Sequence, residues 1–164
     1  MTQKNHNMQM AQILTESRVV SDLSVVEKRE ILAYLAGLFV LDIPGVGKKQ
    51  ILHEFLERER VGTTGIGMGI AIPHAKLPGL VYPLVALGRS VRGVDFDAMD
   101  GGKVHLIVAL ISPLAQTTEG TKIHLEALTA ISRLLRSPSN RRRLLEAPDQ
   151  KALFHAALAP PSID

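Results

Sequence analysis

His74 is the first residue whose setting could support chemistry. It lies near the end of residues 62–76, GTTGIGMGIAIPHAK, directly after Pro73 and two residues before Lys76. Proline fixes its own φ and biases Ile72 toward an extended backbone, so the imidazole should leave a stiff strand end. No carboxylate lies within four residues on either side, which is a poor setting for a metal ligand. The setting suits a nucleophile that holds a dianionic group, and a structural histidine is the alternative.

His124 is the second candidate, because it falls on the apolar face of a predicted helix. Leu128, Ile131 and Leu135 follow it at the spacing of residues that share one helix face. We expect the helix to begin after TTEGTK, which would place His124 in its first turn. The free N–H groups and the helix dipole there would keep the ring neutral and favour a nearby anion. A neutral ring could donate one hydrogen bond to a phosphoryl oxygen or to another histidine.

Arg58 could bring a cation to the same place. With Arg60 it lies near the end of a predicted helix over residues 49–61, where cations are favoured by the helix dipole. A guanidinium near His74 would also form paired hydrogen bonds to phosphoryl oxygens. The alternative is a solvated run of charges in which the arginines pair with Glu57 or Glu59.

The glycines that precede His74 match no nucleotide-binding motif. Gly65, Gly67 and Gly69 alternate with Ile66 and Met68, unlike the Gly-Lys-Ser/Thr phosphate loop or the dinucleotide fingerprint. Glycine permits unusual backbone angles and close approach by another surface. We expect these residues to form a floor for a docking partner and to offer amides to a phosphoryl group. A flexible connection is the alternative.

The remaining histidines favour no further site. We expect His53, His105, His6 and His155 to be structural or exposed. A zinc site made by His74, His105 and His124 is an open but weak alternative, since no carboxylate spacing supports it. The sequence contains no cysteine, which excludes thiolate nucleophiles and thiolate metal sites within this chain.

Composition places the chain among ordinary globular domains. Its 164 residues are 46% hydrophobic and 21% charged, with a formal charge of +3 and a pI of 9.4. That small basic excess, with two Tyr, four Phe and no Trp, does not favour nucleic acid, whereas an acidic or phosphorylated partner fits. The polar first residues lack a secretory signal and the apolar runs are too short to span a bilayer. We therefore expect a cytoplasmic protein without membrane insertion.

The pattern of apolar residues predicts an α/β fold, a mixed central β-sheet flanked by helices in a single compact domain. Ser24 and Glu27 have the spacing of a capping box and predict a helix over residues 25–40. Residues 80–91 and 103–112 are apolar runs typical of strands, and their link is too short for a crossover helix, so they should pair antiparallel. Further strands are expected at 18–23 and 70–73, and further helices at 8–14, 121–137, 139–147 and 149–159.

Two stretches taken together resemble a known family. RERVGTTGIGMGIAIPHAK and HLEALTAISRLL resemble the enzyme IIA domain of the fructose/mannitol class in the bacterial phosphoenolpyruvate-dependent phosphotransferase system, most closely its free-standing nitrogen-regulatory type. The resemblance covers nearly the whole chain. It predicts one domain over residues 8–159, with an N-terminal tail at 1–7 and a C-terminal tail at 160–164.

The resemblance implies a phosphotransferase component that needs no cofactor and no metal. His74 would accept a phosphoryl group on Nε2 from an HPr-like phosphocarrier protein, His124 would hydrogen-bond that group, and Arg58 would support it. Glu59 lies beside that arginine, and Thr64 matches a hydroxyl position lining the pocket. Met68 departs from the pattern, which we expect to alter the docking surface rather than the chemistry.

The next partner would be either of two kinds. A IIB component usually accepts the phosphoryl group on a cysteine, which this chain cannot supply itself. The alternative is a regulatory target, such as a transporter, a kinase or a transcription regulator, that responds to the phosphorylation state.

Overall fold

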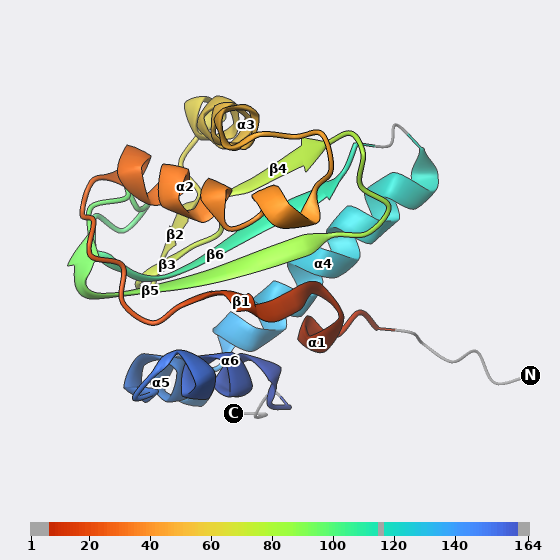
Figure 1. Ribbon diagram of the computed structural model, residues 1–164. Coiled ribbons are helices and arrows are strands. Elements are labelled where there is room, and N and C mark those ends of the chain that lie inside the picture. The colour runs from red at the N-terminus through yellow and green to blue at the C-terminus, as the bar shows by residue number, and fades with distance from the viewer. Residues whose placement is uncertain (1–6, 115–116, 161–164) are drawn as a thin grey trace, which may run out of the picture.

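A mixed β-sheet forms the centre of the computed structural model, which describes residues 7–114 and 117–160 (Figure 1). Its long strands β5 (Leu84–Val94) and β6 (Val104–Pro113) pair antiparallel, as predicted. On one side of this pair β1 (Leu14–Val20) runs parallel to β5. On the other side β6 pairs in parallel with two short strands, β3 (Ile70–Ala71) and β4 (His74–Leu77).

A hairpin with a two-residue turn completes the sheet. It joins β2 (Gly65–Gly67) to β3, and the two strands are antiparallel. Met68 and Gly69 form the turn with φ of +56° and +75°, the positive values of the type I′ turn that suits the twist of a hairpin. The strand order is β1-β5-β6-β3-β2, with β4 on β6 beyond β3, so the sheet is mixed.

Helices cover both faces of the sheet, and the predicted fold class is confirmed (Figure 1). On one face lie α2 (Lys28–Gly37) and α3 (Lys48–Val61), joined through the short 3₁₀ helix η1 (Val40–Asp42). The opposite face carries α1 (Met10–Ile13), α4 (Thr118–Arg136), α5 (Pro138–Glu146) and α6 (Gln150–Leu158). Within the two described ranges, every helix is too short or too polar to span a bilayer.

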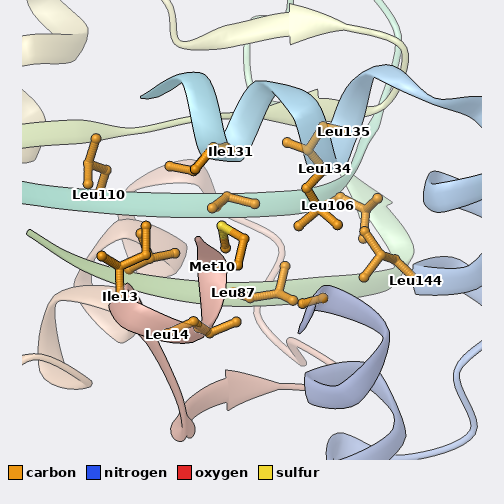
Figure 2. Close-up of a cluster of buried hydrophobic side chains, with 14 of the residues drawn as sticks. Met10, Ile13, Leu14, Leu87, Leu106, Leu110, Ile131, Leu134, Leu135 and Leu144 are labelled. Carbon is orange, nitrogen blue, oxygen red and sulfur yellow. The ribbon is translucent and has the colours of Figure 1, made fainter. Parts of the chain in front are cut away.

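Alternating side chains of β6 serve two separate cores. Leu106, Val108 and Leu110 face the α4 side, where they pack with residues of α1, α4, α5 and α6. Figure 2 shows Leu106 and Leu110 among labelled side chains of α1, α4 and α5. Ile107 and Ile111 face α2 and α3. This alternation follows from the two-residue repeat of a strand, and it makes β6 the central element of both apolar layers.

Some predicted boundaries are wrong. The capping box at Ser24 is absent, because α2 begins at Lys28 with Glu27 at its N-cap. Residues 21–27 lie outside regular secondary structure, and there the Leu23 N–H donates to the Arg89 carbonyl 2.7 Å away on β5 and the Leu23 side chain is buried. The strand expected at 18–23 therefore begins and ends earlier, as β1, and the helix expected to reach residue 40 ends at Gly37.

Candidate functional site

His74 begins β4 at the edge of the sheet, where the helices of the two faces approach each other. In the parallel register with β6 it lies opposite Leu110. Ala75 and Leu77 point into the core, so the pleat turns His74 and Lys76 to the other side of the strand. Pro73 separates β3 from β4 because it has no N–H, while its carbonyl still accepts from the Leu110 N–H at 2.9 Å.

Both ring nitrogens of His74 have defined partners. Nδ1 lies 2.9 Å from the carbonyl oxygen of Ile72, which can only accept, so Nδ1 carries the hydrogen. Nε2 lies 3.1 Å from Nε of Arg58, which can only donate, so Nε2 presents its lone pair. Two independent contacts thus select the same neutral tautomer, with an unprotonated Nε2.

Arg58 reaches His74 from the last turn of α3. Its Nη1 also donates to the carbonyl of Gly62 at 2.9 Å, which fixes the guanidinium against the residue that follows the helix. A cation near the C-terminus of α3 is favoured by the helix dipole, so the same arginine suits the helix and the histidine.

His124 approaches His74 from the other face of the sheet. Its ring centroid lies 5.7 Å from that of His74 with 50° between the planes, and the residue is 9% exposed. Its Nδ1 lies 2.7 Å from the Ser112 hydroxyl on β6. The structure thus brings His74, His124 and Arg58 together although the first two are 50 residues apart in the sequence.

The helix that carries His124 starts earlier than expected. α4 begins at Thr118, and the Thr117 hydroxyl caps it by accepting from the Gly120 N–H at 3.0 Å. His124 is therefore in the second turn rather than the first, beyond the free N–H groups. The expectation that the helix terminus keeps this ring neutral is wrong.

These three residues line an open depression of about 450 Å³. Its walls also include two glutamates of α3, two residues of β4 and the exposed side chain at the end of β6, which are Glu54, Glu57, Ala75, Lys76 and Leu114. A phosphoryl group is small beside this volume, so a partner's side chain could enter with it.

The electrostatic setting keeps both rings neutral. Burial is the main cause that lowers the pKa of His74 below 6.5, and Arg58 and Lys76 add to it, against the opposing contributions of the Ile72 carbonyl and Glu59. Burial, followed by the charges of Lys76 and His74, lowers the pKa of His124 to about 4. Two neutral imidazoles beside two cations form a site suited to an anion.

Glu59 and Thr64 lie beside the depression and do not line it. The Glu59 carboxylate accepts from the Thr64 N–H at 3.2 Å and from the Thr64 hydroxyl, and it pairs with Nζ of Lys28 at 2.7 Å. Thr64 is 3% exposed. The two residues connect the end of α3 to the start of β2, so their contacts are structural in the resting protein.

Gly67 and Gly69 lie at the far end of β3 from His74, whereas Gly65 pairs with Ala71 at the nearer end. The hairpin pairs near Leu106, roughly 13 Å along β6 from the partner of His74. The Gly65 N–H donates to the Thr63 hydroxyl and the Met68 N–H to the Asp100 carboxylate, each at 3.0 Å. The Gly65 amide is thus satisfied within the loop and the Met68 amide by the segment that links β5 to β6, contrary to the expectation that the loop offers its amides to a phosphoryl group.

Gly65 has a packing role. A Cβ at this position would lie 2.9 Å from Cα of Ala98, which is closer than side-chain carbons approach a backbone. Gly67 and Gly69 have positive φ, and Met68 at the tip is 62% exposed. A docking role for this hairpin remains a proposal.

The other histidines lie apart from the depression. His53 is exposed on α3 and His155 on α6, while Nδ1 of half-buried His105 lies 2.9 Å from the Ser90 carbonyl. His6 lies outside the described residues. Among residues 7–114 and 117–160, no three histidine or acidic side chains cluster as metal ligands would.

Two residues of the site, Lys76 and Ser112, were not predicted from the sequence. Lys76 could have been found, because side chains at i and i+2 of a strand share a face. Ser112 could not, since its contact with His124 depends on how α4 packs on β6.

Comparison with known proteins gives consistent matches. Residues 12–158 match the family described as "Phosphoenolpyruvate-dependent sugar phosphotransferase system, EIIA 2". The chain is 37% identical to the nitrogen regulatory protein of Pseudomonas aeruginosa over 147 residues, 90% of this chain and 93% of that one. It is 36% identical over 149 residues to the PTS system fructose-specific EIIABC component of Bacillus subtilis, 90% of this chain but 22% of that protein.

Solved structures share the fold. The crystal structure of nitrogen regulatory protein IIA-Ntr from Neisseria meningitidis superposes with a TM-score of 0.81 at 28% identity, covering 90% of this chain and 98% of that one. Enzyme IIA mannitol of Escherichia coli, solved in complex with phosphorylated enzyme IIB mannitol, gives 0.70 at 15% identity with coverage of 88% and 98%. The second likeness concerns the fold alone.

Proposed function

Because the chain belongs to the EIIA 2 family of the phosphoenolpyruvate-dependent sugar phosphotransferase system, we propose that it relays a phosphoryl group on His74. Proteins of this family are phosphotransfer components. The observation that carries the proposal is the hydrogen bonding of the His74 ring, whose Nδ1 hydrogen is held by Ile72 and whose Nε2 lone pair lies in the depression. An acceptor of a phosphoryl group needs this state.

The transfer requires one bond to form and one to break. Nε2 of His74 attacks the phosphorus, and the bond from phosphorus to the donor's ring nitrogen breaks with its electron pair left on that nitrogen. The donor ring then takes a proton from solvent, while His74 keeps its Nδ1 proton against the Ile72 carbonyl. Phosphoryl transfer asks little more of a protein than alignment and charge stabilisation.

Arg58 and His124 supply the stabilisation. Arg58 already donates to Nε2 and would move that hydrogen bond to an oxygen of the arriving phosphoryl group. His124 lies across the depression and would donate to a second oxygen. Lys76 adds positive charge beside both rings, as the lowered pKa values of His74 and His124 reflect.

We propose an HPr-like phosphocarrier protein as the donor and a IIB component as the acceptor. Support comes from the family and from the fold shared with an enzyme IIA solved in complex with its phosphorylated IIB partner. Since the sequence has no cysteine, a cysteine acceptor would belong to the partner chain. The proposed compartment is the cytoplasm, where phosphoenolpyruvate is made.

A regulatory function is the second candidate. The match to the nitrogen regulatory protein of Pseudomonas aeruginosa extends over 93% of that protein, whereas the fructose-specific match corresponds to 22% of a longer one. The phosphorylation state of His74 would then control binding to a transporter, a kinase or a transcription regulator. Affinity capture with phosphorylated wild type and with His74→Ala as bait discriminates the two, since a regulator retains targets in one state only.

The first experiment tests the phosphoryl acceptor. Radiolabelled phosphoenolpyruvate, enzyme I and a phosphocarrier protein are incubated with the wild type, His74→Ala, and His53→Ala as a matched control on the exposed face of α3. We expect label in the wild type and in His53→Ala and none in His74→Ala, whereas His124→Ala accepts label but passes it on poorly. Undiminished labelling of His74→Ala would reject the assignment.

A further inference from the structure

Ser112 contacts the site from within the sheet. It lies on β6 opposite Lys76 of β4, it is fully buried, and its Oγ is 2.7 Å from Nδ1 of His124. A hydroxyl and an imidazole nitrogen can each donate or accept, so the distance alone leaves the direction of this hydrogen bond open.

The surroundings of the hydroxyl decide the direction. In the described part of the chain, the His124 nitrogen is the one hydrogen-bond partner of Ser112 Oγ. Were Nδ1 to donate, the buried hydroxyl hydrogen would have no acceptor, and an unsatisfied buried donor is costly. The hydroxyl therefore donates, and Nδ1 of His124 carries the lone pair.

A neutral imidazole has one hydrogen, which must then be on Nε2. Burial and the neighbouring positive charges keep His124 neutral, with a pKa of about 4. Since Nδ1 is turned toward β6, Nε2 is the nitrogen left to serve the depression that His124 lines with His74.

We infer that Ser112 is a positioning residue that holds His124 as a hydrogen-bond donor toward a phosphoryl group on His74. This inference rests on the proposed function for its purpose, although the tautomer itself can be measured without any phosphoryl transfer. The opposite tautomer would direct a lone pair at the negative oxygens and repel them. The Ser112 hydroxyl, which does not contact the phosphoryl group, thereby determines that the His124 ring donates a hydrogen bond to it.

Nitrogen-15 NMR tests the tautomer directly. Long-range proton–nitrogen spectra of the uniformly labelled wild type, at a pH above 7, distinguish protonated from unprotonated ring nitrogens. We expect His124 protonated on Nε2, and His74 protonated on Nδ1. A His124 hydrogen on Nδ1 would overturn the inference without bearing on phosphorylation, and labelled His74→Ala would overturn the proposed function without bearing on the tautomer.

Variants test whether the serine matters. Ser112→Ala should lose the fixed tautomer of His124 and slow phosphoryl transfer about fivefold to tenfold, the factor that one ordinary hydrogen bond represents. Ser112→Thr keeps the hydroxyl and should retain both the His124 tautomer and the transfer rate of the wild type. Ser90→Ala is the matched control, because Ser90 is also a buried strand serine and its hydroxyl accepts from the Gly93 N–H instead.

The outcomes separate a positioning role from a structural one. Ser90→Ala should lower the thermal midpoint but leave the His124 nitrogen resonances and the transfer rate unchanged. An unchanged tautomer and rate in Ser112→Ala would overturn the inference, as would an equal change of both in Ser90→Ala.

Discussion

A backbone carbonyl and a guanidinium, each hydrogen-bonded to one ring nitrogen, give His74 its chemical state. A free imidazole exchanges its hydrogen between both nitrogens and takes a second one near neutral pH. Here a carbonyl that can only accept and a guanidinium that can only donate assign the two nitrogens. The ring is thus held in the state that the proposed nucleophile needs, with Nε2 unprotonated.

The pH dependence of phosphoryl acceptance should follow the pKa of His74. Burial lowers that pKa below 6.5, so the ring is neutral at pH 7.5 and takes up its second proton with a midpoint below pH 6.5. The labelling rate, corrected for the donor's own pH profile, should therefore fall as the pH drops through that midpoint. Carbon and nitrogen NMR of the His74 ring gives the midpoint, and a midpoint at or above 6.5 would contradict the prediction.

Arg58→Met provides a matched variant for that titration. Arg58 contributes to the lowering, because its charge disfavours the imidazolium. Its removal should raise the pKa of His74 relative to the wild type and, through loss of a charge-assisted hydrogen bond, slow labelling about tenfold to a hundredfold. Arg60→Met in the same turn, whose guanidinium pairs with Glu57 instead, should leave both unchanged.

Spacing and neighbours made His74 and His124 candidates in the sequence, whereas Arg58 also fitted a solvated run of charges and gained its proposed role from the family resemblance. Ser112 was not predicted as a site residue, since no neighbouring residue in the sequence points to such a role. The resemblance placed Thr64 at a hydroxyl position lining the pocket and Glu59 beside Arg58. In the structure Thr64 donates its N–H and its hydroxyl to the Glu59 carboxylate, because a carboxylate at the end of a helix is close to the amides that follow it. Side-chain direction at a helix end is decided by packing rather than by spacing.

At the scale of elements, one partly buried ion pair holds the segment that carries Arg58. Lys28, at the first position of α2, donates to the Glu59 carboxylate of α3 and lies 4.7 Å from the ring centroid of Phe96. A cation at a helix N-terminus is unfavourable, so these contacts must compensate for the dipole. The pair joins two helices and the loop before β2 directly beside the depression.

Lys28→Met should destabilise the protein by about 2–3 kcal/mol. The substitution leaves the Glu59 carboxylate, whose side chain is 6% exposed, without its cation, although the Thr64 donors remain. Urea unfolding monitored by circular dichroism measures the loss. Lys49→Met is the control, since Lys49 is exposed in the first turn of α3 and its loss should be neutral or slightly stabilising. Equal effects of both variants would contradict a special role for the pair.

At the scale of the whole molecule, the two apolar layers depend on the same strand. β6 sends alternate side chains into the α2–α3 core and into the core of α1, α4, α5 and α6. A cavity in either layer should therefore loosen both, because the two sets of helices pack on opposite faces of the same sheet.

Ile107→Ala tests this coupling. Ile107 is fully buried on the α2–α3 side, so the substitution should cost about 2–5 kcal/mol. Hydrogen exchange followed by mass spectrometry should show that slowly exchanging peptides of α3 and of α6 lose protection by the same amount. Leu125→Ala on the exposed side of α4 should change neither by more than about 0.5 kcal/mol. Loss confined to α3 would show that the layers unfold separately.

The sequence predicted the overall architecture better than it predicted the short strands. Long apolar runs and helical periods gave the mixed sheet between helices and the antiparallel pair of β5 and β6. The short strands β2 and β4 were not predicted, because three or four residues that include glycine or histidine show no clear alternation of apolar and polar side chains. The family resemblance is confirmed by the match over residues 12–158, while the predicted tails at 1–7 and 160–164 fall largely outside the described residues.

The contact between Arg58 and the lone pair of His74 has a consequence for the idle protein. An uncovered imidazole nitrogen reacts with acylating reagents and coordinates stray transition-metal ions. The Arg58 guanidinium donates a hydrogen bond to that nitrogen and repels cations, so we expect it to protect His74 from such reactions in the resting protein. A group with negative oxygens, such as a phosphoryl group, offers Arg58 a stronger hydrogen bond than the neutral ring does. Its binding would draw the guanidinium away and expose Nε2 of His74.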